Sequence, residues 1–384
     1  MKYVDEFRDG TVARGIADEI AREVREGRSY RFMEFCGGQT HTLWRYGIVD
    51  MLPAQVHISH GPGSPVCVLP LGRIEQAIEL SRRPNVTLCT FGEMLRVPAR
   101  DKKSLLRTKA DGADVRVVHG IADALRFAED DPSREYVFFA TGFEASTPAT
   151  AVIVKRAAEL GLRNFSVFCN HLLTPSAMAA VLSPSATGAE PIAVDGFLAP
   201  GEVSTIIGSA PYEAFARDAA TPVVVSGCEP LDLLQSILML VRQVNDGRHE
   251  VENEYTRAVT PAGNTKAVAL VDEVFELRPT FAWRGLGVVP RSALRLRARY
   301  AAWDAEKKWG LPYEDLADPK ACGCSDVVRT SKSPSECKMY GTACLPESPA
   351  GPCMVTPEGS CASHYAYGQL ARAVTAGEPG DTES

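Results

Sequence analysis

The sequence predicts an α/β protein with two Rossmann-like domains, each built on a parallel sheet, and a small cysteine-rich domain at the C-terminal end. Three observations favour this fold class. Short β-branched or aromatic runs alternate with amphipathic segments, which is the pattern of βαβ units. Two of these runs lead directly into similar glycine loops, FMEFCGGQTH and FFATGFEAST. Six of the eleven cysteines lie between Cys322 and Cys361.

The predicted strands fall into two sets of four, separated by a linker signal at Asp130, Asp131 and Pro132. Helical periodicity follows most strands and is clearest over residues 149–160, 176–182 and 231–244. We therefore expect an α/β domain over 1–130, a second over 131–305 and the cysteine-rich domain over 306–384. The basic stretch 291–299 is expected to be a solvated helix face. The predicted strands are residues 31–35, 55–59, 86–90, 115–118, 136–140, 165–168, 193–197 and 222–226.

Composition narrows the class of protein. A chain of 384 residues with 45% hydrophobic and 23% charged residues is typical of a soluble globular protein. The net charge is −7 and the basic residues form no single block, which argues against nucleic acid or an anionic membrane as a partner. The N-terminal stretch lacks the pattern of a secretory signal, and no apolar run approaches the roughly 18 residues of a membrane span. We expect a cytoplasmic protein.

The C-terminal cysteines must hold their segment together, because it is interrupted by prolines and glycines and has few large apolar residues. Disulfides, structural zinc and an iron–sulfur cluster are the candidates. Thiols persist in a reducing cytosol, so metal binding is favoured over disulfides.

Polar residues and thiols follow nearly every predicted strand, where open parallel sheets bind their ligands. Cys36 stands out, because a thiol on a Gly-Gly turn before a helix has surroundings that lower a thiolate pKa. Cys67 lies on a rigid loop, GPGSPVC, in which Ser64 prevents a Cys-x-x-Cys pair. Cys89, Cys169 and Cys228 are expected to be small buried hydrophobic residues. The other strand-end residues are Gln39, His41, His60, Gly92, Glu93, His119, Glu144, His171, Glu202 and Glu229.

Several of these motifs together resemble the HypD family of hydrogenase maturation proteins. They are the loop around Cys36, GPGSPVC, the GFE of 142–144, PGEVSTI from Pro200, and the C-terminal CGCSDVVRTSKSPSECKMYGTACLPESPAGPCMVTPEGSCASHYAY. The resemblance runs in order over nearly the whole chain. It implies two α/β domains, a smaller domain with a [4Fe-4S] cluster, and a scaffold on which the Fe(CN)2CO unit of nickel–iron hydrogenases is assembled.

The resemblance also implies roles for individual residues. Cys322, Cys337, Cys344 and Cys361 would hold the cluster, in the spacing C-x14-C-x6-C-x16-C. Cys36 would bind the iron that receives CO and cyanide, with Cys67, His41 and Glu144 nearby. The implied partners are a small HypC-type chaperone, a HypE-type cyanide donor and, indirectly, the hydrogenase large subunit.

The chain departs from the family pattern at Ser64, where the family has cysteine, and at Glu202, where it has histidine. GFE is also followed by Ala145 and Ser146 rather than two threonines. Two other functions stay open: an iron–sulfur oxidoreductase and a zinc-stapled α/β binding protein. The first should carry a nucleotide fingerprint, and the sequence has neither G-x-G-x-x-G after a strand nor G-x4-G-K-[ST].

Overall fold

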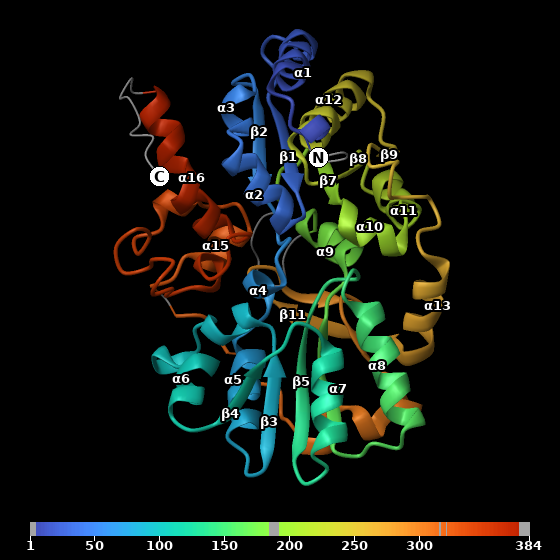
Figure 1. The fold of residues 1–384 in the computed structure, drawn as a ribbon. Coiled ribbons are helices and arrows are strands. Elements are labelled where there is room, and N and C mark those ends of the chain that lie inside the picture. Colours follow the sequence, from blue (N-terminus) through green and yellow to red (C-terminus); the bar gives the residue numbers. More distant parts are fainter. Residues whose placement is uncertain (1–4, 184–191, 315, 320, 376–384) are drawn as a thin grey trace.

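Two parallel β-sheets form the frame of the molecule in the computed structural model, which describes residues 5–183, 192–314, 316–319 and 321–375 (Figure 1). The first sheet contains β1 (Tyr30–Glu34), β2 (Val56–His60), β7 (Gly196–Pro200), β8 (Val223–Ser226) and β9 (Val251–Asn253), in the order β2-β1-β7-β8-β9. The second contains β3 (Val86–Thr90), β4 (Asp114–Val117), β5 (Glu135–Gly142) and β6 (Phe165–His171), in the order β4-β3-β5-β6. The predicted α/β class with parallel sheets is therefore confirmed.

Helices follow the strands, as βαβ connections require. Residues 376–384 of the expected C-terminal domain lie outside the described residues. The α-helices are α1 (Gly10–Glu23), α2 (Gly37–Arg45), α3 (Ile48–Met51), α4 (Pro65–Val68), α5 (Leu71–Ser81), α6 (Leu105–Ala110), α7 (Ile121–Asp130), α8 (Thr147–Glu159), α9 (Thr174–Val181), α10 (Gly201–Ile207), α11 (Pro211–Asp218), α12 (Pro230–Asp246), α13 (Thr265–Val274), α14 (Ala305–Trp309), α15 (Cys324–Val328) and α16 (Ser360–Thr375). The 3-10 helices are η1 (Asp5–Phe7), η2 (Gly92–Arg96), η3 (Arg100–Lys102), η4 (Ala298–Trp303), η5 (Pro334–Glu336) and η6 (Pro352–Met354).

The strands do not divide at position 130 as expected. β3 and β4 share a sheet with β5 and β6, whereas β1 and β2 share theirs with β7, β8 and β9. The linker signal at 130–132 covers the last residue of α7 and the start of its short connection to β5, inside one βαβ unit. A polar turn ends a helix in the same way that it marks a domain boundary, so the local signal could not separate the two.

Two small antiparallel ribbons complete the strands: β10 (Phe275–Leu277) pairs with β13 (Leu294–Leu296), and β11 (Thr280–Trp283) pairs with β12 (Gly287–Pro290). The first ribbon contacts β6 of the second sheet through β13. Residues 294–296 form strand β13, so the prediction of a helix face over 291–299 is wrong there. Leu294 and Leu296 are buried and Arg295 between them is exposed, which is the two-residue alternation of a strand.

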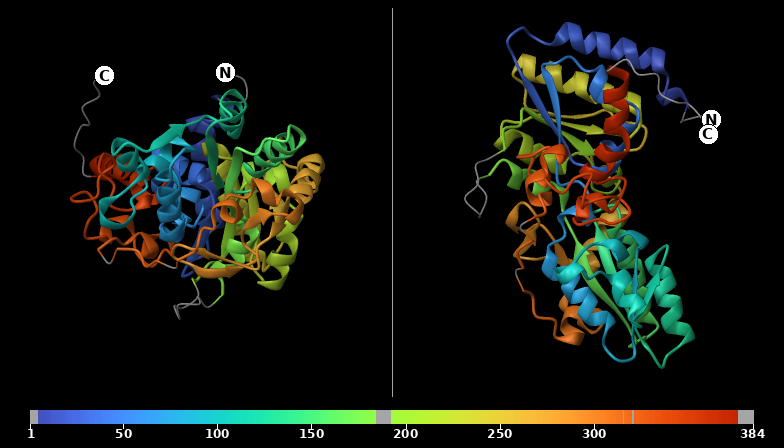
Figure 2. Two further views of the ribbon diagram at one scale, coloured as in Figure 1. Left: turned by 90° about the horizontal axis from the view of Figure 1, so that it is seen from below. Right: turned by 90° about the vertical axis from the view of Figure 1, so that its left-hand side faces the viewer.

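One continuous apolar core joins both sheets and the cysteine-rich segment. It contains Phe35 and Phe197 of the first sheet region, Phe139 and Phe168 of the second, and Met354 of the C-terminal segment. The cysteine-rich segment thus packs on the shared core, whereas its shortage of large apolar residues had pointed to the cysteines as the groups that hold it together. Figure 2 shows α1 and α12 side by side at one end of the molecule and α16 running along its flank.

Candidate functional site

Cys36 is held rigidly at the carboxyl end of β1, just before α2. The buried carboxylate of Glu34 accepts the Cys36 backbone N–H at 2.8 Å, pairs with His60 Nδ1 at 2.9 Å and accepts the Thr40 hydroxyl. The loop that leads to Cys67 packs closely against the same turn. A Cβ at Gly63 would lie 2.3 Å from the Cys36 nitrogen, so only glycine fits there.

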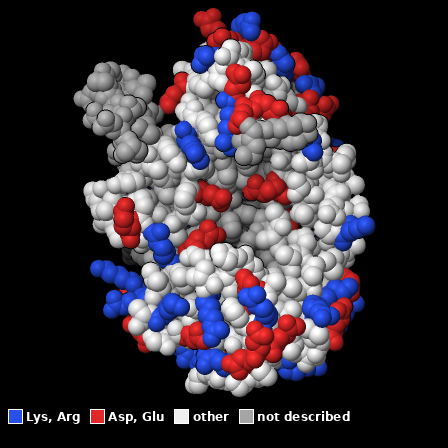
Figure 3. All heavy atoms as spheres, in the orientation of Figure 1, with Lys and Arg blue, Asp and Glu red and all other residues white. Residues whose placement is uncertain are grey.

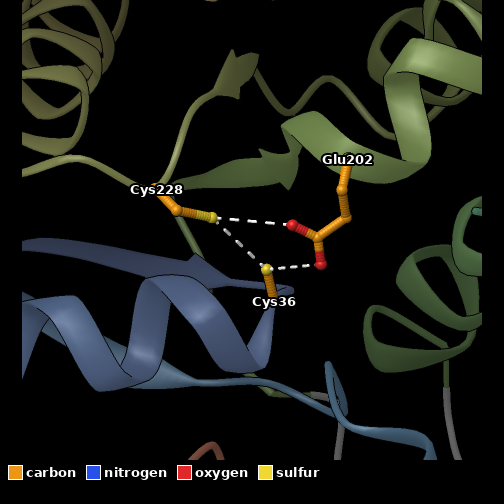
Figure 4. Close-up of side chains that lie close together, drawn as sticks. All are labelled: Cys36, Glu202 and Cys228. Atoms are coloured by element: carbon orange, nitrogen blue, oxygen red, sulfur yellow. Dashed lines mark hydrogen bonds between the residues drawn. The ribbon is translucent and has the colours of Figure 1, made fainter. Parts of the chain in front are cut away.

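Three side chains converge at this point: Cys36, Glu202 and Cys228 (Figure 4). The Cys36 Sγ donates to Glu202 Oε1 at 3.0 Å and lies 3.8 Å from the Cys228 Sγ. The Cys228 Sγ lies 3.6 Å from Glu202 Oε2. Cys36 is 1% exposed, Cys228 is half-buried and Glu202 is exposed, so the group has one open side.

Strand order explains this convergence. Cys36 follows β1, Glu202 lies in the first turn of α10 after β7, and Cys228 follows β8. The strands β1, β7 and β8 are consecutive neighbours in one parallel sheet, so their carboxyl ends lie side by side. The expectation that Cys228 is a buried hydrophobic residue is therefore wrong, whereas Cys89 and Cys169 are buried as expected.

The cluster changes the electrostatics expected for Cys36. Its pKa is raised well above the ordinary thiol value by the hydrogen bond with Cys228, by burial, and by the charges of Cys228 and Glu202. A lowered pKa was expected from the helix start alone. The two acidic neighbours outweigh that effect, so a cation is what would favour the thiolate.

Further carboxylates lie near the group formed by Cys36, Glu202 and Cys228. The pKa of Glu358 is raised by burial and by the charges of Glu202 and Glu93. The pKa of Glu93 is raised by burial, although a hydrogen bond with Thr356 opposes the shift. Figure 3 shows acidic side chains around a hollow in the middle of one face. Such a hollow attracts cations.

Glu144 lies at the end of the other sheet, in the loop between β5 and α8. It is buried, and its carboxylate accepts the Thr174 backbone N–H at 2.8 Å and the Thr174 hydroxyl at 2.9 Å. Burial raises its pKa to about 7. It lines a largely apolar cavity of about 380 Å³. Buried Tyr212 interacts electrostatically with Glu144, Glu202 and Cys36. It therefore links Glu144, at the end of one sheet, to Cys36 and Glu202 at the end of the other.

His41 points toward the C-terminal segment. Its Nε2 lies 3.2 Å from the hydroxyl of Tyr367 in α16, and its pKa is lowered by partial burial and by Arg45. It therefore contributes to the packing of α16 on α2.

Cys67 in α4 faces the C-terminal cysteines. The pKa of the Cys353 thiol is raised strongly by hydrogen bonds with Cys324, Cys361 and Cys67, and by burial. The hydroxyl of Ser64, at the start of α4, is buried without a hydrogen-bond partner in the described part of the chain.

Cys324 lies at the centre of the C-terminal thiols. Its pKa is lowered well below the ordinary value by hydrogen bonds from Cys322, Cys353 and Cys361. Cys344 interacts electrostatically with Cys324 and Cys337. All eleven cysteines lie within the described residues and are free thiols.

The C-terminal thiols fit a thiolate-bound metal or iron–sulfur group. A Cβ at Gly351 would lie 2.4 Å from the Cys322 sulfur and 2.5 Å from the Cys324 sulfur, so the backbone passes directly beside them. Buried sulfur donors grouped in this way suit zinc or an iron–sulfur cluster equally. The sequence interpretation left Cys324 and Cys353 out of the ligand set, and their contacts place both within the same group.

Among the residues that the structure describes, none of the helices has the length and apolar character of a membrane span.

A family model, HypD, described as "Hydrogenase formation hypA family", matches residues 11–368. The chain is 56% identical to the hydrogenase expression/formation protein HupD of Azotobacter chroococcum mcd 1, over 97% of this chain and 98% of that protein. It is 55% identical to the hydrogenase maturation factor HypD of Azotobacter vinelandii, over 98% and 99% of the two chains. The hydrogenase maturation factor HypD of Escherichia coli K12 is 40% identical, over 96% and 99%.

Proposed function

The chain belongs to the HypD family of hydrogenase maturation factors, and we propose that it is the scaffold on which the Fe(CN)2CO unit of a nickel–iron hydrogenase is assembled. The observation that carries this proposal is the match over nearly the whole chain, combined with a rigidly held thiol, Cys36, at the carboxyl end of a parallel sheet.

In this proposal Cys36 binds the iron as cargo. Low-spin iron(II) with CO and cyanide accepts soft thiolate donors, and a thiolate on a fixed strand-end turn supplies one. A thiolate of a small HypC-type partner would complete the anchorage. One ligand from each protein allows the iron to pass on when the complex separates. Glu144 would act at a distance by taking up or releasing a proton. His41 would act by helping α16 to pack on α2.

We further propose that Cys322, Cys337, Cys344 and Cys361 hold a [4Fe-4S] cluster. The gathering of these thiols around Cys324 supports a metal group there. Such a cluster would supply one-electron transfer. Cys67 contacts Cys353, and the loop that leads to it lies against the Cys36 turn. Cys67 would therefore be the thiol that connects the cluster region with Cys36.

The remaining parts of the proposal concern partners and location. A HypE-type protein would donate cyanide, the hydrogenase large subunit would receive the finished unit indirectly, and assembly would take place in the cytoplasm. The protein would act as a scaffold, with any redox or ATPase activity confined to the assembled complex.

Complementation tests the proposal. The gene for this chain, expressed in a bacterium that lacks its own HypD, should restore nickel–iron hydrogenase activity. Cys36→Ala should abolish the restored activity, because no other side chain in the turn offers a soft donor. Cys89→Ala is the matched control, since it removes a buried thiol far from the site and should retain activity. Full activity with Cys36→Ala would refute the proposed role of Cys36.

A further inference from the structure

We propose that Cys228 and Glu202 bind the same metal ion as Cys36, so that this chain alone supplies two thiolates and one carboxylate. The inference rests on the proposed function for the identity of the ion as ferrous iron, and on the geometry for the site itself. It adds two ligands to the single thiolate that the family resemblance implies.

The distances suit a shared ion. With metal–sulfur bonds of about 2.3 Å and metal–oxygen bonds of about 2.0 Å, a tetrahedral centre separates two sulfurs by about 3.8 Å and a sulfur from an oxygen by about 3.5 Å. The two sulfurs here lie 3.8 Å apart, and the sulfur–oxygen distances are 3.0 and 3.6 Å. The three groups therefore need only small rotations to bind one ion.

Charge gives the group a reason to bind a cation. With both thiols ionised, the three side chains carry three negative charges in a partly buried place, and Glu93 and Glu358 add to the negative potential. Binding of a divalent ion would release the two thiol protons to solvent and leave the site with one net negative charge. The hydrogen bonds now made among the three groups would be replaced by bonds to the ion.

The donor types define the class of ion. Two thiolates with one carboxylate suit a borderline divalent ion such as iron(II), zinc(II) or cobalt(II), and do not suit magnesium or calcium, which prefer oxygen ligands. Three protein ligands leave a tetrahedral position open on the exposed side, as in metal sites that exchange ligands. That position is available to a partner's thiolate on the bare ion; once two cyanides and CO are bound, six-coordinate iron has room for only one of Cys228 and Glu202 beside Cys36 and that thiolate.

Glu202 also explains a departure from the family pattern. The family motif has histidine at this position, and both side chains can donate one atom to a metal. The substitution therefore keeps a ligand while changing its charge. Glu202→His should accordingly preserve metal binding, whereas Glu202→Gln should weaken it.

Cobalt(II) alone is the probe for the test, added to the full-length protein purified without oxygen. The wild type should bind one ion per chain at this site, seen as thiolate-to-cobalt charge-transfer absorption in a difference spectrum. Cys228→Ser should lose about half of that absorption, because one of two thiolates is removed. Its affinity should fall by at least the roughly 10- to 100-fold that follows loss of an outer-shell partner.

Cys89→Ala is the matched control and should keep the wild-type spectrum. Wild-type absorption and affinity in Cys228→Ser would overturn the inference. So would a Cys36–Cys228 disulfide, found by mass spectrometry in protein purified without oxygen, since the two sulfurs would then serve as a redox pair.

The same variants separate this inference from the proposed function. A wild type that binds cobalt through two thiolates but does not restore hydrogenase activity would contradict the proposed function and leave the site standing. Full restoration of activity by Cys228→Ser, together with none by Cys36→Ala, would contradict the inference and leave the proposed function standing.

Discussion

Cys36 follows a buried strand and precedes α2, and its thiol meets a carboxylate and a second thiol that follow two other strands of the same sheet. A thiol between a buried strand and a Gly-Gly turn can be recognised locally. Its pKa could not be, since the groups that raise it are Cys228 and Glu202, which are far away in the chain. The local sequence indicates which residues stand at strand ends. The order of the strands in the sheet decides which of these side chains lie next to one another.

Glu144 should make stability depend on pH. Its folded pKa of about 7 exceeds its ordinary value of 4.5, so its contribution to stability is complete below pH 4.5 and is lost as the pH rises through about 7. The shift corresponds to about 3 kcal/mol. The unfolding free energy of the wild type, relative to Glu144→Gln, should therefore fall by about that amount between these pH values.

Denaturant unfolding of both proteins across this pH range gives the measurement. Glu144→Gln is nearly isosteric and cannot ionise, so the other buried acids cancel in the comparison. A difference between the two proteins that stays constant from pH 4.5 to above 7 would show that the carboxyl is not held in its neutral form.

At the scale of elements, the sequence predicted those with a clear period and missed the short ones. All eight predicted strands exist, although β7 begins three residues later than predicted. The strands β9 to β13 are only three or four residues long, and their pattern is too brief to identify. The loop between β2 and α4 approaches Cys36 closely at Gly63, a contact between two segments that neither segment's local pattern predicts.

Ser64→Cys tests whether this loop keeps the shape of a Cys-x-x-Cys turn. The Cys67 N–H donates to the Ser64 carbonyl at 3.0 Å, so both residues belong to one helical turn. The Ser64 hydroxyl has no partner to lose. Pro65 restricts the reduced loop and lowers the ordering cost of a bridge. Mild oxidation of the variant should therefore consume two free thiols and form a bridge between the new cysteine and Cys67.

Mass spectrometry under denaturing conditions identifies the pair, and Ser64→Ala should keep the wild-type thiol count. An unpaired new thiol, under conditions that oxidise an ordinary Cys-x-x-Cys protein, would mean that the contact of Cys67 with Cys353 governs the loop. The redox chemistry of the family motif would then not apply to this chain.

At the scale of the whole molecule, the sequence predicted two parallel sheets but not which strands each contains. The chain leaves the first sheet after β2, builds the whole second sheet and then returns to add β7, β8 and β9. Nothing local records that return, because a strand's hydrogen-bonding partner is set by long-range packing. The consequence is functional: Cys36 meets Glu202 and Cys228 only because the returning strands lie beside β1.

In the proposed function, Cys36 carries the iron that receives CO and cyanide. The most direct measurement is the infrared spectrum of the complex that copurifies with the chain from its host without oxygen. The wild-type complex should show a pair of cyanide bands and a CO band. Cys36→Ala should lack all three while keeping about four cluster irons per chain. Unchanged band intensities in Cys36→Ala would contradict the proposed role of Cys36 as the ligand of this iron.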